Sequence, residues 1–288
     1  MRQHRTLLIT TCADEKLLAK QRTATADVAF LELEDGVLAD QKAEARARCL
    51  DALQNWDYQG KERWVRINQI TTLDGMRDLM ELVPGRPDAL IPGKLRSKDE
   101  ITVADYILSR REEELGLPAG EIKLCPMVES GPAVINLKEI ITASPRMIGV
   151  CLGTEDLSVD VGIMRTEEER ELEWVRGHVV MTCHALGVEC FDVASVKLRE
   201  PKALWQEARR VYHMGYDGKM CISPTQVDVI HDAFTPEPEK IAWAQKIIKA
   251  AAEAEQQGTS VFAVDGRMVD YPFIEQAKQI LRRAGQDA

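Results

Sequence analysis

Acidic side chains recur in this sequence where short apolar runs end. Four of the runs end in or beside a carboxylate, and two others end beside a cation. The acidic residues are Glu34 with Asp35, Glu129, Asp156 and Asp192, and the cations are Arg66 and Lys94. Unpaired carboxylates that meet at one place repel one another, and a hard divalent cation removes that cost. Because no His or Cys joins the set, the pattern favours Mg²⁺ over zinc.

Each of these residues, taken alone, also has a plain structural explanation. Asp156 would serve as a helix cap after Gly153, and Asp35 before Gly36 is typical of a turn. Arg66 lies in a run otherwise suited to burial, so it needs an anionic partner, either a structural carboxylate or a substrate carboxylate. For the whole set of strand ends we favour a functional site.

Eight short apolar runs alternate with segments of helical periodicity. Gly, Pro or charged residues bound each run, as expected for strands that are buried on both faces. The runs are 6–10, 27–34, 63–68, 89–94, 122–129, 146–153, 187–192 and 216–223. Their alternation with helices predicts an α/β protein, and the number eight favours a closed (β/α)8 TIM barrel over an open doubly wound sheet. No G-x-G-x-x-G follows a run, which disfavours a dinucleotide-binding version of the open sheet.

Helical segments are expected between these runs, at 41–54, 98–115, 166–186 and 201–214. Thr166, with Glu169 three residues later, predicts a capping box at the start of the third segment. In a β/α barrel the active site lies at the C-terminal ends of the strands, so the acidic and basic residues would meet at one mouth.

The chain changes character after Phe234, where T-P-E-P interrupts the pattern. We therefore expect a barrel over 1–234 and a C-terminal helical extension over 235–288, too small for an independent core. The extension should contain a helix over 239–256, a short extended piece, a D-G turn and a final amphipathic helix. It would cap the barrel mouth or dock on a neighbouring subunit.

Composition limits the classes of function. Hydrophobic residues make up 45% of the 288 residues and charged residues 29%, a globular mixture, and the net charge of −10 argues against a general nucleic-acid binder. No stretch approaches the roughly 20 apolar residues that cross a bilayer. The seven Cys include no C-x-x-C pair, so we expect buried free thiols and a reducing cytoplasm. The five His fall in helices or at the terminus, and we interpret them as structural or surface residues.

Six stretches with moderately specific motifs run through nearly the whole chain. They are LELEDGV (31–37) with Lys42 and Ala45-Arg46 after it, VRIN (65–68), MVESGPAVINLKEI (127–140), GTEDLSVDVG (153–162), YDGKMCISPTQVDVIHDAF (216–234) and VDGRMVDYP (264–272). In this order and spacing the sequence resembles the citrate lyase β-subunit-like branch of the HpcH/HpaI aldolase superfamily. The resemblance implies a β/α barrel with a C-terminal extension, assembled as trimers or hexamers.

The resemblance also implies roles for single residues. Glu129 and Asp156 match the family's Mg²⁺ ligands, and Arg66 matches the residue that grips the carboxylate of a 2-oxo acid. Glu34 and Asp35 would lie beside the metal and its waters or act in proton transfer.

Further matches concern substrate recognition and the acid or base. Asp270 matches an Asp that, in malyl-CoA-lyase-like members, reaches into a neighbour's site as acid or base. Lys94, in Pro92-Gly93-Lys94, stands where the family has P-K and would contact substrate. Where the family usually has F-V-P-G after its first strand, this chain has LLITTCADEK. Glu34-Asp35 replaces the His of the class II pyruvate aldolases and favours the acyl-CoA lyase branch.

The expected activity is a Mg²⁺-dependent carbon–carbon lyase that cleaves or forms a 3-hydroxy-acyl-CoA, with a 2-oxo acid and acetyl-CoA or another acyl-CoA as products. Glyoxylate, pyruvate and oxaloacetate present the same chelating pair, so the acid stays open. Three alternatives also stay open: an aldolase on a 2-oxo acid aldol without CoA, the β subunit of a multi-component citrate lyase, and a non-catalytic binding protein.

Overall fold

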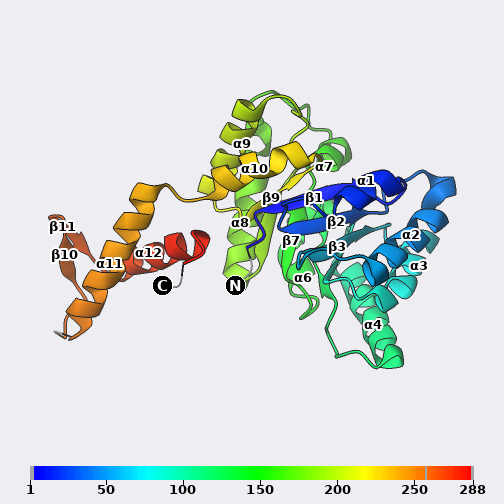
Figure 1. The fold of residues 1–288 in the computed structure, drawn as a ribbon, viewed down its shortest axis with the longest axis horizontal. Coiled ribbons are helices and arrows are strands. Elements are labelled where there is room, and N and C mark those ends of the chain that lie inside the picture. The colour runs from blue at the N-terminus through cyan, green and yellow to red at the C-terminus, as the bar shows by residue number, and fades with distance from the viewer. Residues whose placement is uncertain (1–2, 257, 287–288) are drawn as a thin grey trace. The chain divides into compact units, whose positions relative to one another are not determined.

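Parallel strands form one sheet in the first part of the chain (Figure 1). The computed structural model describes residues 3–256 and 258–286. Within them the sheet has nine strands: β1 (Thr6–Thr11), β2 (Val28–Glu32), β3 (Glu62–Ile67), β4 (Ala89–Pro92), β5 (Lys123–Leu124), β6 (Met127–Val128), β7 (Gly149–Leu152), β8 (Glu189–Asp192) and β9 (Gly218–Cys221). Each overlaps one of the eight predicted runs, and only β1 and β3 extend beyond theirs, by one residue each.

Two of the nine strands, β5 and β6, are the halves of one interrupted strand. β5 pairs with β4 and β6 pairs with β7, at the two ends of the sheet order β5-β4-β3-β2-β1-β9-β8-β7-β6. Pro126 lies between them and has no N–H to donate to a ladder. Leu124 also bridges Met147, and its N–H donates to the Arg146 carbonyl at 2.9 Å. The sheet therefore closes on itself, and the predicted (β/α)8 barrel is confirmed.

Large side chains fill the barrel interior. The apolar cluster inside it consists of Leu7, Val28, Phe30, Trp64, Ala89, Ile91, Cys125, Met127, Cys151, Phe191 and Met220. Trp64 and Phe191 are fully buried and meet edge to face, with ring centroids 5.5 Å apart. As in other barrels of this size, side chains fill the interior as a packed core without a pore. Polar residues lie at the strand ends.

Helices pack around the outside of the strands (Figure 1). They are α1 (Glu15–Lys20), α2 (Lys42–Asn55), α3 (Leu73–Glu81), α4 (Lys98–Leu115), α5 (Gly131–Ile135), α6 (Leu137–Ile141), α7 (Thr154–Val161), α8 (Glu173–Leu186), α9 (Pro201–Met214) and α10 (Pro224–Phe234), with short 3₁₀ turns at Ala39–Gln41, Val83–Gly85 and Arg170–Leu172. The helices predicted at 98–115 and 201–214 have the expected bounds.

The capping box predicted at Thr166 is wrong. α8 begins seven residues later, at Glu173, and Thr166 donates its N–H and its hydroxyl to Glu171, each at 2.8 Å. The Glu169 carboxylate that would have completed the box contacts Arg176 at 2.8 Å and Arg210 at 3.3 Å. Because these charges hold the carboxylate, the segment folds as a turn instead of a helical start.

Residues from His231 onward, with Gln3, form a second compact unit. It contains α11 (Pro238–Gln256), the antiparallel pair β10 (Phe262–Val264) and β11 (Arg267–Val269), and α12 (Tyr271–Arg283). The predicted D-G turn is present, with Asp265 at φ 50° and Gly266 at φ 74°. Contrary to expectation, the unit has a small apolar core of its own, made of Ala244, Ile247, Val264, Val269, Ala277 and Leu281.

No helix in residues 3–256 and 258–286 is both long enough and apolar enough to cross a membrane.

Candidate active site

Arg66, in β3, lies among four carboxylates at the C-terminal end of the barrel strands. A guanidinium nitrogen of Arg66 is 2.5 Å from Glu34, 3.1 Å from Asp35, 3.3 Å from Glu32 and 3.4 Å from Glu129. Of the four, only Asp35 is exposed to solvent. Glu32 ends β2 and is the direct cross-strand neighbour of Arg66. The predicted meeting of these strand ends is confirmed for Glu34, Asp35, Arg66 and Glu129.

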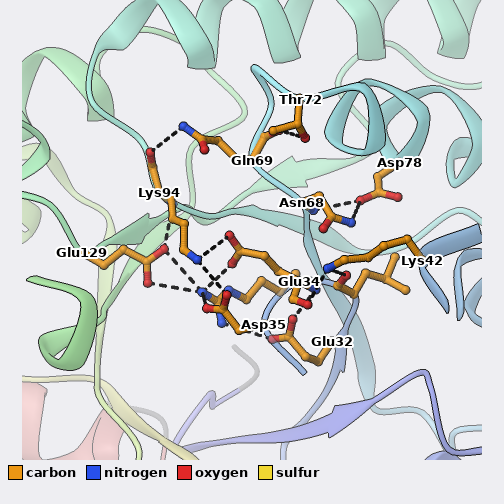
Figure 2. A network of polar contacts seen from close by, with 12 residues as sticks. Glu32, Glu34, Asp35, Lys42, Asn68, Gln69, Thr72, Asp78, Lys94 and Glu129 are labelled. Carbon is orange, nitrogen blue, oxygen red and sulfur yellow. Dashed lines mark hydrogen bonds and ion pairs between the residues drawn. The ribbon is translucent and has the colours of Figure 1, made fainter. Parts of the chain in front are cut away.

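Lys94 joins the same group from the end of β4 (Figure 2). Its Nζ is 2.7 Å from Asp35 and 3.5 Å from Glu34, and its backbone N–H donates to Glu129 Oε1 at 2.7 Å. Lys94 has φ 55°, a left-handed conformation that is costly for a residue with a side chain. The strained backbone turns the N–H of Lys94 toward Glu129. We call Arg66, Lys94, Glu32, Glu34, Asp35 and Glu129 the Arg66 cluster.

Two glycines, which have no Cβ, make room for the carboxylates of Glu34 and Glu129. A Cβ on Gly93 would lie 2.6 Å from Glu34 Oε2 and 3.2 Å from Glu129 Oε1. A Cβ on Gly153 would lie 2.7 Å from Glu129 Oε2. Glu34 and Glu129 therefore border one small, oxygen-lined space that any larger residue at these positions would disturb. Such a donor set fits a hard cation such as Mg²⁺.

Asp156 approaches this space from the first turn of α7. It is half-buried, and its charge raises the pKa of both Glu129 and Lys94. Within the described part of the chain the Asp156 carboxylate makes no hydrogen bond or ion pair, so it does not cap the turn after Gly153. Its oxygens are available to a ligand.

Burial and crowding change the protonation of the carboxylates. Burial, with the charges of Glu129 and Asp35, raises the pKa of Glu34 to about 7, although Arg66 and Lys94 oppose this. Burial likewise raises the pKa of Glu32 to about 6, and that of Glu129 above its usual range. Burial alone would raise the pKa of Asp35, but Lys94 and Arg66 hold it below its usual range. The cluster thus carries more acidic groups than its cations can keep ionised.

Lys42 holds the turn that carries Glu34 and Asp35 (Figure 2). From the start of α2, its Nζ donates to the carbonyls of Leu33 at 2.9 Å and Glu34 at 2.6 Å. The Glu34 carbonyl also accepts the Val37 N–H at 3.0 Å. Sequence reasoning from residue types gave Lys42 no role, and its spacing from Glu34 was the available signal.

Asp78 holds the end of β3 in the same way (Figure 2). Its carboxylate accepts the backbone N–H and the side-chain amide of Asn68 at 2.8 and 2.7 Å, and pairs with Arg46 at 2.5 Å. All three side chains are buried. Because Asn68 follows β3 directly, these bonds fix the direction in which the strand leaves the barrel beyond Arg66.

Asp192 does not belong to the Arg66 cluster, contrary to expectation. Its buried carboxylate pairs with Arg176 at 2.9 Å and Lys219 at 2.7 Å. Lys219 also contacts Glu207 at 2.8 Å, and Arg176 contacts Glu169 at 2.8 Å. We call these five residues the Asp192 cluster. Its cations satisfy Asp192, so this carboxylate has a structural role.

Asp270 lies in the C-terminal unit, at the N-cap position of α12. Its side chain makes no capping hydrogen bond, and its buried Oδ1 has no hydrogen-bond partner among the residues described. A role for Asp270 in a neighbouring subunit's site stays a prediction.

Comparison with known proteins places these residues in a wider group. Residues 5–224 match the family model described as HpcH/HpaI aldolase/citrate lyase. The chain is 31% identical to citrate lyase subunit beta of Haemophilus influenzae over 99% of this chain and 98% of that protein. It is 32% identical to the mitochondrial citramalyl-CoA lyase of Mus musculus over 94% of this chain and 83% of that one.

A solved structure is similar in fold along nearly the full length of this chain. It is the protein CitE from Mycobacterium tuberculosis in complex with magnesium, acetoacetate and coenzyme A. The TM-score is 0.81 at 28% identity, covering 99% of this chain and all of that one.

Proposed function

Because the chain belongs to the HpcH/HpaI aldolase/citrate lyase family, we propose that it is a Mg²⁺-dependent carbon–carbon lyase acting on a 3-hydroxy-acyl-CoA. The products would be a 2-oxo acid and acetyl-CoA or another acyl-CoA. The excess of carboxylates over cations around Arg66, with Asp156 unpaired beside it, carries the proposal. The magnesium and coenzyme A in the related solved structure support it.

Glu129 and Asp156 would hold the ion. Glu129 is buried between Gly93 and Gly153, and Asp156 has no competing partner in the described chain. A bound Mg²⁺ would lower the pKa of the substrate hydroxyl and stabilise the developing carbonyl. Glu34 and Asp35 would lie beside it and its waters.

Arg66 would bind the carboxylate of the 2-oxo acid. Its guanidinium is spread over four carboxylates, and its Nε is buried with no hydrogen-bond partner in the described chain. A cation at Glu129 would weaken the hold of that carboxylate on Arg66 and leave the fork of the guanidinium for a bidentate pair with substrate. Lys94, linked to Glu34 and Asp35, would orient these carboxylates or contact substrate.

The cleavage needs a group that takes and returns one proton. The substrate hydroxyl loses its proton to a carboxylate, and its oxygen becomes the carbonyl of the 2-oxo acid. The bond between the carbinol carbon and the thioester α-carbon breaks, its electron pair stays on the α-carbon, and a proton added there gives the acyl-CoA. Asp35, Glu34 and Asp270 are the candidate carriers, and the pKa of Glu34, about 7, suits a carrier near neutral pH.

Calorimetric titration tests the site and selects the acid. Oxaloacetate, glyoxylate and pyruvate would each be titrated with and without Mg²⁺ into wild type, Arg66→Ala and, as a control, Arg86→Ala, which removes an exposed Arg paired with Glu121. We expect Mg²⁺-dependent binding of one acid by wild type and the control, lost in Arg66→Ala. Binding that is independent of Mg²⁺, or that persists in Arg66→Ala, would contradict the assignment.

A second candidate is the β subunit of a multi-component citrate lyase, which acts on a carrier-bound thioester. Similarity over nearly the full length of a citrate lyase β subunit favours it. Turnover of free CoA esters by the isolated protein would exclude it, while turnover of carrier-bound substrate alone would establish it. Turnover of a CoA-free aldol would instead indicate an aldolase. Assembly as a homotrimer or hexamer and a cytoplasmic location remain predictions for this chain.

A further inference from the structure

A second group of ligand-type side chains lies at the opposite ends of the strands from Arg66. His184 is in the last turn of α8, Cys190 is near the start of β8, and Asp217 immediately precedes β9. Among the residues that the structure describes, these three form a group in which one ligand atom from each lies within 4.8 Å of the others. The elements that carry them are neighbours around the barrel.

The distances within the group suit a tetrahedral ion. His184 Nε2 is 4.0 Å from Cys190 Sγ and 3.7 Å from Asp217 Oδ2, and Cys190 Sγ is 3.7 Å from Asp217 Oδ2. With metal–ligand bonds of about 2.0–2.3 Å, tetrahedral ligand atoms lie about 3.3–3.6 Å apart. The side chains need to move by only a few tenths of an ångström.

The chemistry of these ligands differs from that of the Arg66 cluster. A thiolate, an imidazole and a carboxylate together favour Zn²⁺ and similar ions, whereas the oxygen-only set favours Mg²⁺. We propose that His184, Cys190 and Asp217 form a second metal site, for a thiolate-binding divalent cation of the Zn²⁺ class. The site is independent of the proposed catalytic function.

The surroundings supply access and a fourth position. The Cys190 thiol is buried, but the side chains of His184 and Asp217 are 46% and 22% exposed, so an ion can reach them from solvent. The Gly215 carbonyl, now 2.9 Å from His184 Nε2, or a water would complete the tetrahedron. The Cys190 N–H already holds Asp217 Oδ2 at 3.0 Å, which orients the carboxylate.

Metal binding here must release protons. The hydrogen bond with Cys190 raises the pKa of His184 to about 9, and the hydrogen bond with the Cys183 thiol, followed by burial, raises the pKa of Cys190. Both groups must lose their protons to act as ligands, so the apparent affinity should rise by roughly tenfold per pH unit for each proton released.

Cobalt reports on thiolate ligands directly. Co²⁺ would be titrated into the full chain in excess Mg²⁺, with absorbance followed in the near ultraviolet. We expect a thiolate-to-cobalt charge-transfer band that saturates at one ion per chain and disappears on addition of Zn²⁺. Cys190→Ser should abolish the band. His184→Ala, a change at the surface that the fold should tolerate, should weaken Co²⁺ binding by about tenfold or more.

Two controls separate this site from others. His213→Ala removes an exposed His in the last turn of α9, the position that His184 holds in α8, and should leave the band unchanged. Glu129→Gln, which disables the proposed Mg²⁺ site, should also leave it unchanged. No charge-transfer band in wild type, a band that survives Cys190→Ser, or Co²⁺ binding that His184→Ala leaves unchanged would overturn the proposal.

Discussion

The Arg66 cluster and the Asp192 cluster are both buried groups of charges near strand ends, and they differ in balance. In the Asp192 cluster three carboxylates meet two cations, Arg176 and Lys219, but Glu169 also pairs with Arg210 and Arg165 outside the cluster, so Asp192 keeps two cationic partners. In the Arg66 cluster, four carboxylates share Arg66, and Lys94 is the second cation.

The difference appears in the pKa values. Burial works against ionisation in both clusters, but in the Asp192 cluster Lys219 and Arg176 keep the pKa of Asp192 below its usual range. In the Arg66 cluster the pKa values of Glu32 and Glu34 rise to about 6 and about 7. A balanced cluster is complete within the protein, while an unbalanced one takes up protons or binds a further cation.

The largest expected effect comes from removing a proposed metal ligand. Glu129→Gln or Asp156→Asn should reduce lyase activity by about a thousandfold or more, since metal charge stabilisation is worth several kcal/mol. The thermal midpoint without metal should stay level or rise, because a repelling carboxylate is gone. Steady-state assays and thermal unfolding would measure both. Full turnover by Glu129→Gln in the presence of chelator would contradict the ligand assignment.

The matching change in the balanced cluster should act on stability. Asp192→Asn leaves Arg176 and Lys219 buried with one anion fewer, and should lower the free energy of unfolding by about 3–5 kcal/mol. Urea denaturation would measure it. The exposed Asp51→Asn, on α2, is the control and should have no such effect. Equal stability of Asp192→Asn and wild type would remove the distinction between the clusters.

Mg²⁺ itself should stabilise the wild-type protein. At a free concentration of 100 times the dissociation constant, the gain is about 2.7 kcal/mol. Differential scanning calorimetry with Mg²⁺ and with chelator would detect it. Asp192→Asn should keep this gain and Glu129→Gln should lose it. A gain of the same size in Glu129→Gln would place the ion elsewhere.

The pH dependence of metal-free stability offers a finer test. The pKa of Glu34 is raised from 4.5 to about 7, so between these values the folded state binds more protons than the unfolded chain does. The free energy of unfolding of the metal-free protein therefore falls as the pH rises from 4.5 to about 7. Denaturant midpoints in chelator should show a shallower fall for Glu34→Gln than for wild type. Identical pH profiles would mean that Glu34 is not perturbed.

Substitution of Lys42 should have the smallest effect of these changes. Lys42→Met removes the bonds to the Leu33 and Glu34 carbonyls and should lower kcat by about tenfold with little change in KM, because a misplaced carboxylate affects the transition state more than substrate binding. Lys42→Arg should recover part of the loss. A change confined to KM would instead make Lys42 a substrate-binding residue.

Most of the barrel was predictable because strands buried on both faces appear in the sequence as short apolar runs. Glu34, Asp35, Arg66 and Glu129 could be assigned to one mouth on that basis alone. Asp192 could not be separated from them, because its partners lie 16 and 27 residues away in α8 and β9. Glu32 was missed because its contact with Arg66 depends on strand register.

The interruption at Pro126 also bears on how the barrel closes. β5 and β6 have two residues each, and Pro126 between them cannot donate to the ladder, so the backbone pairing is interrupted at this seam where the edges of the sheet meet. We expect the amides beside this interruption to exchange with solvent sooner than those in the longer pairings of β1, β2 and β3. Glu129 directly follows β6, and Asp156 lies beyond β7 on the other side of the same pairing. An ion bound by both residues would link the two strands β6 and β7, so metal binding should slow amide exchange at Val128 and Gly153.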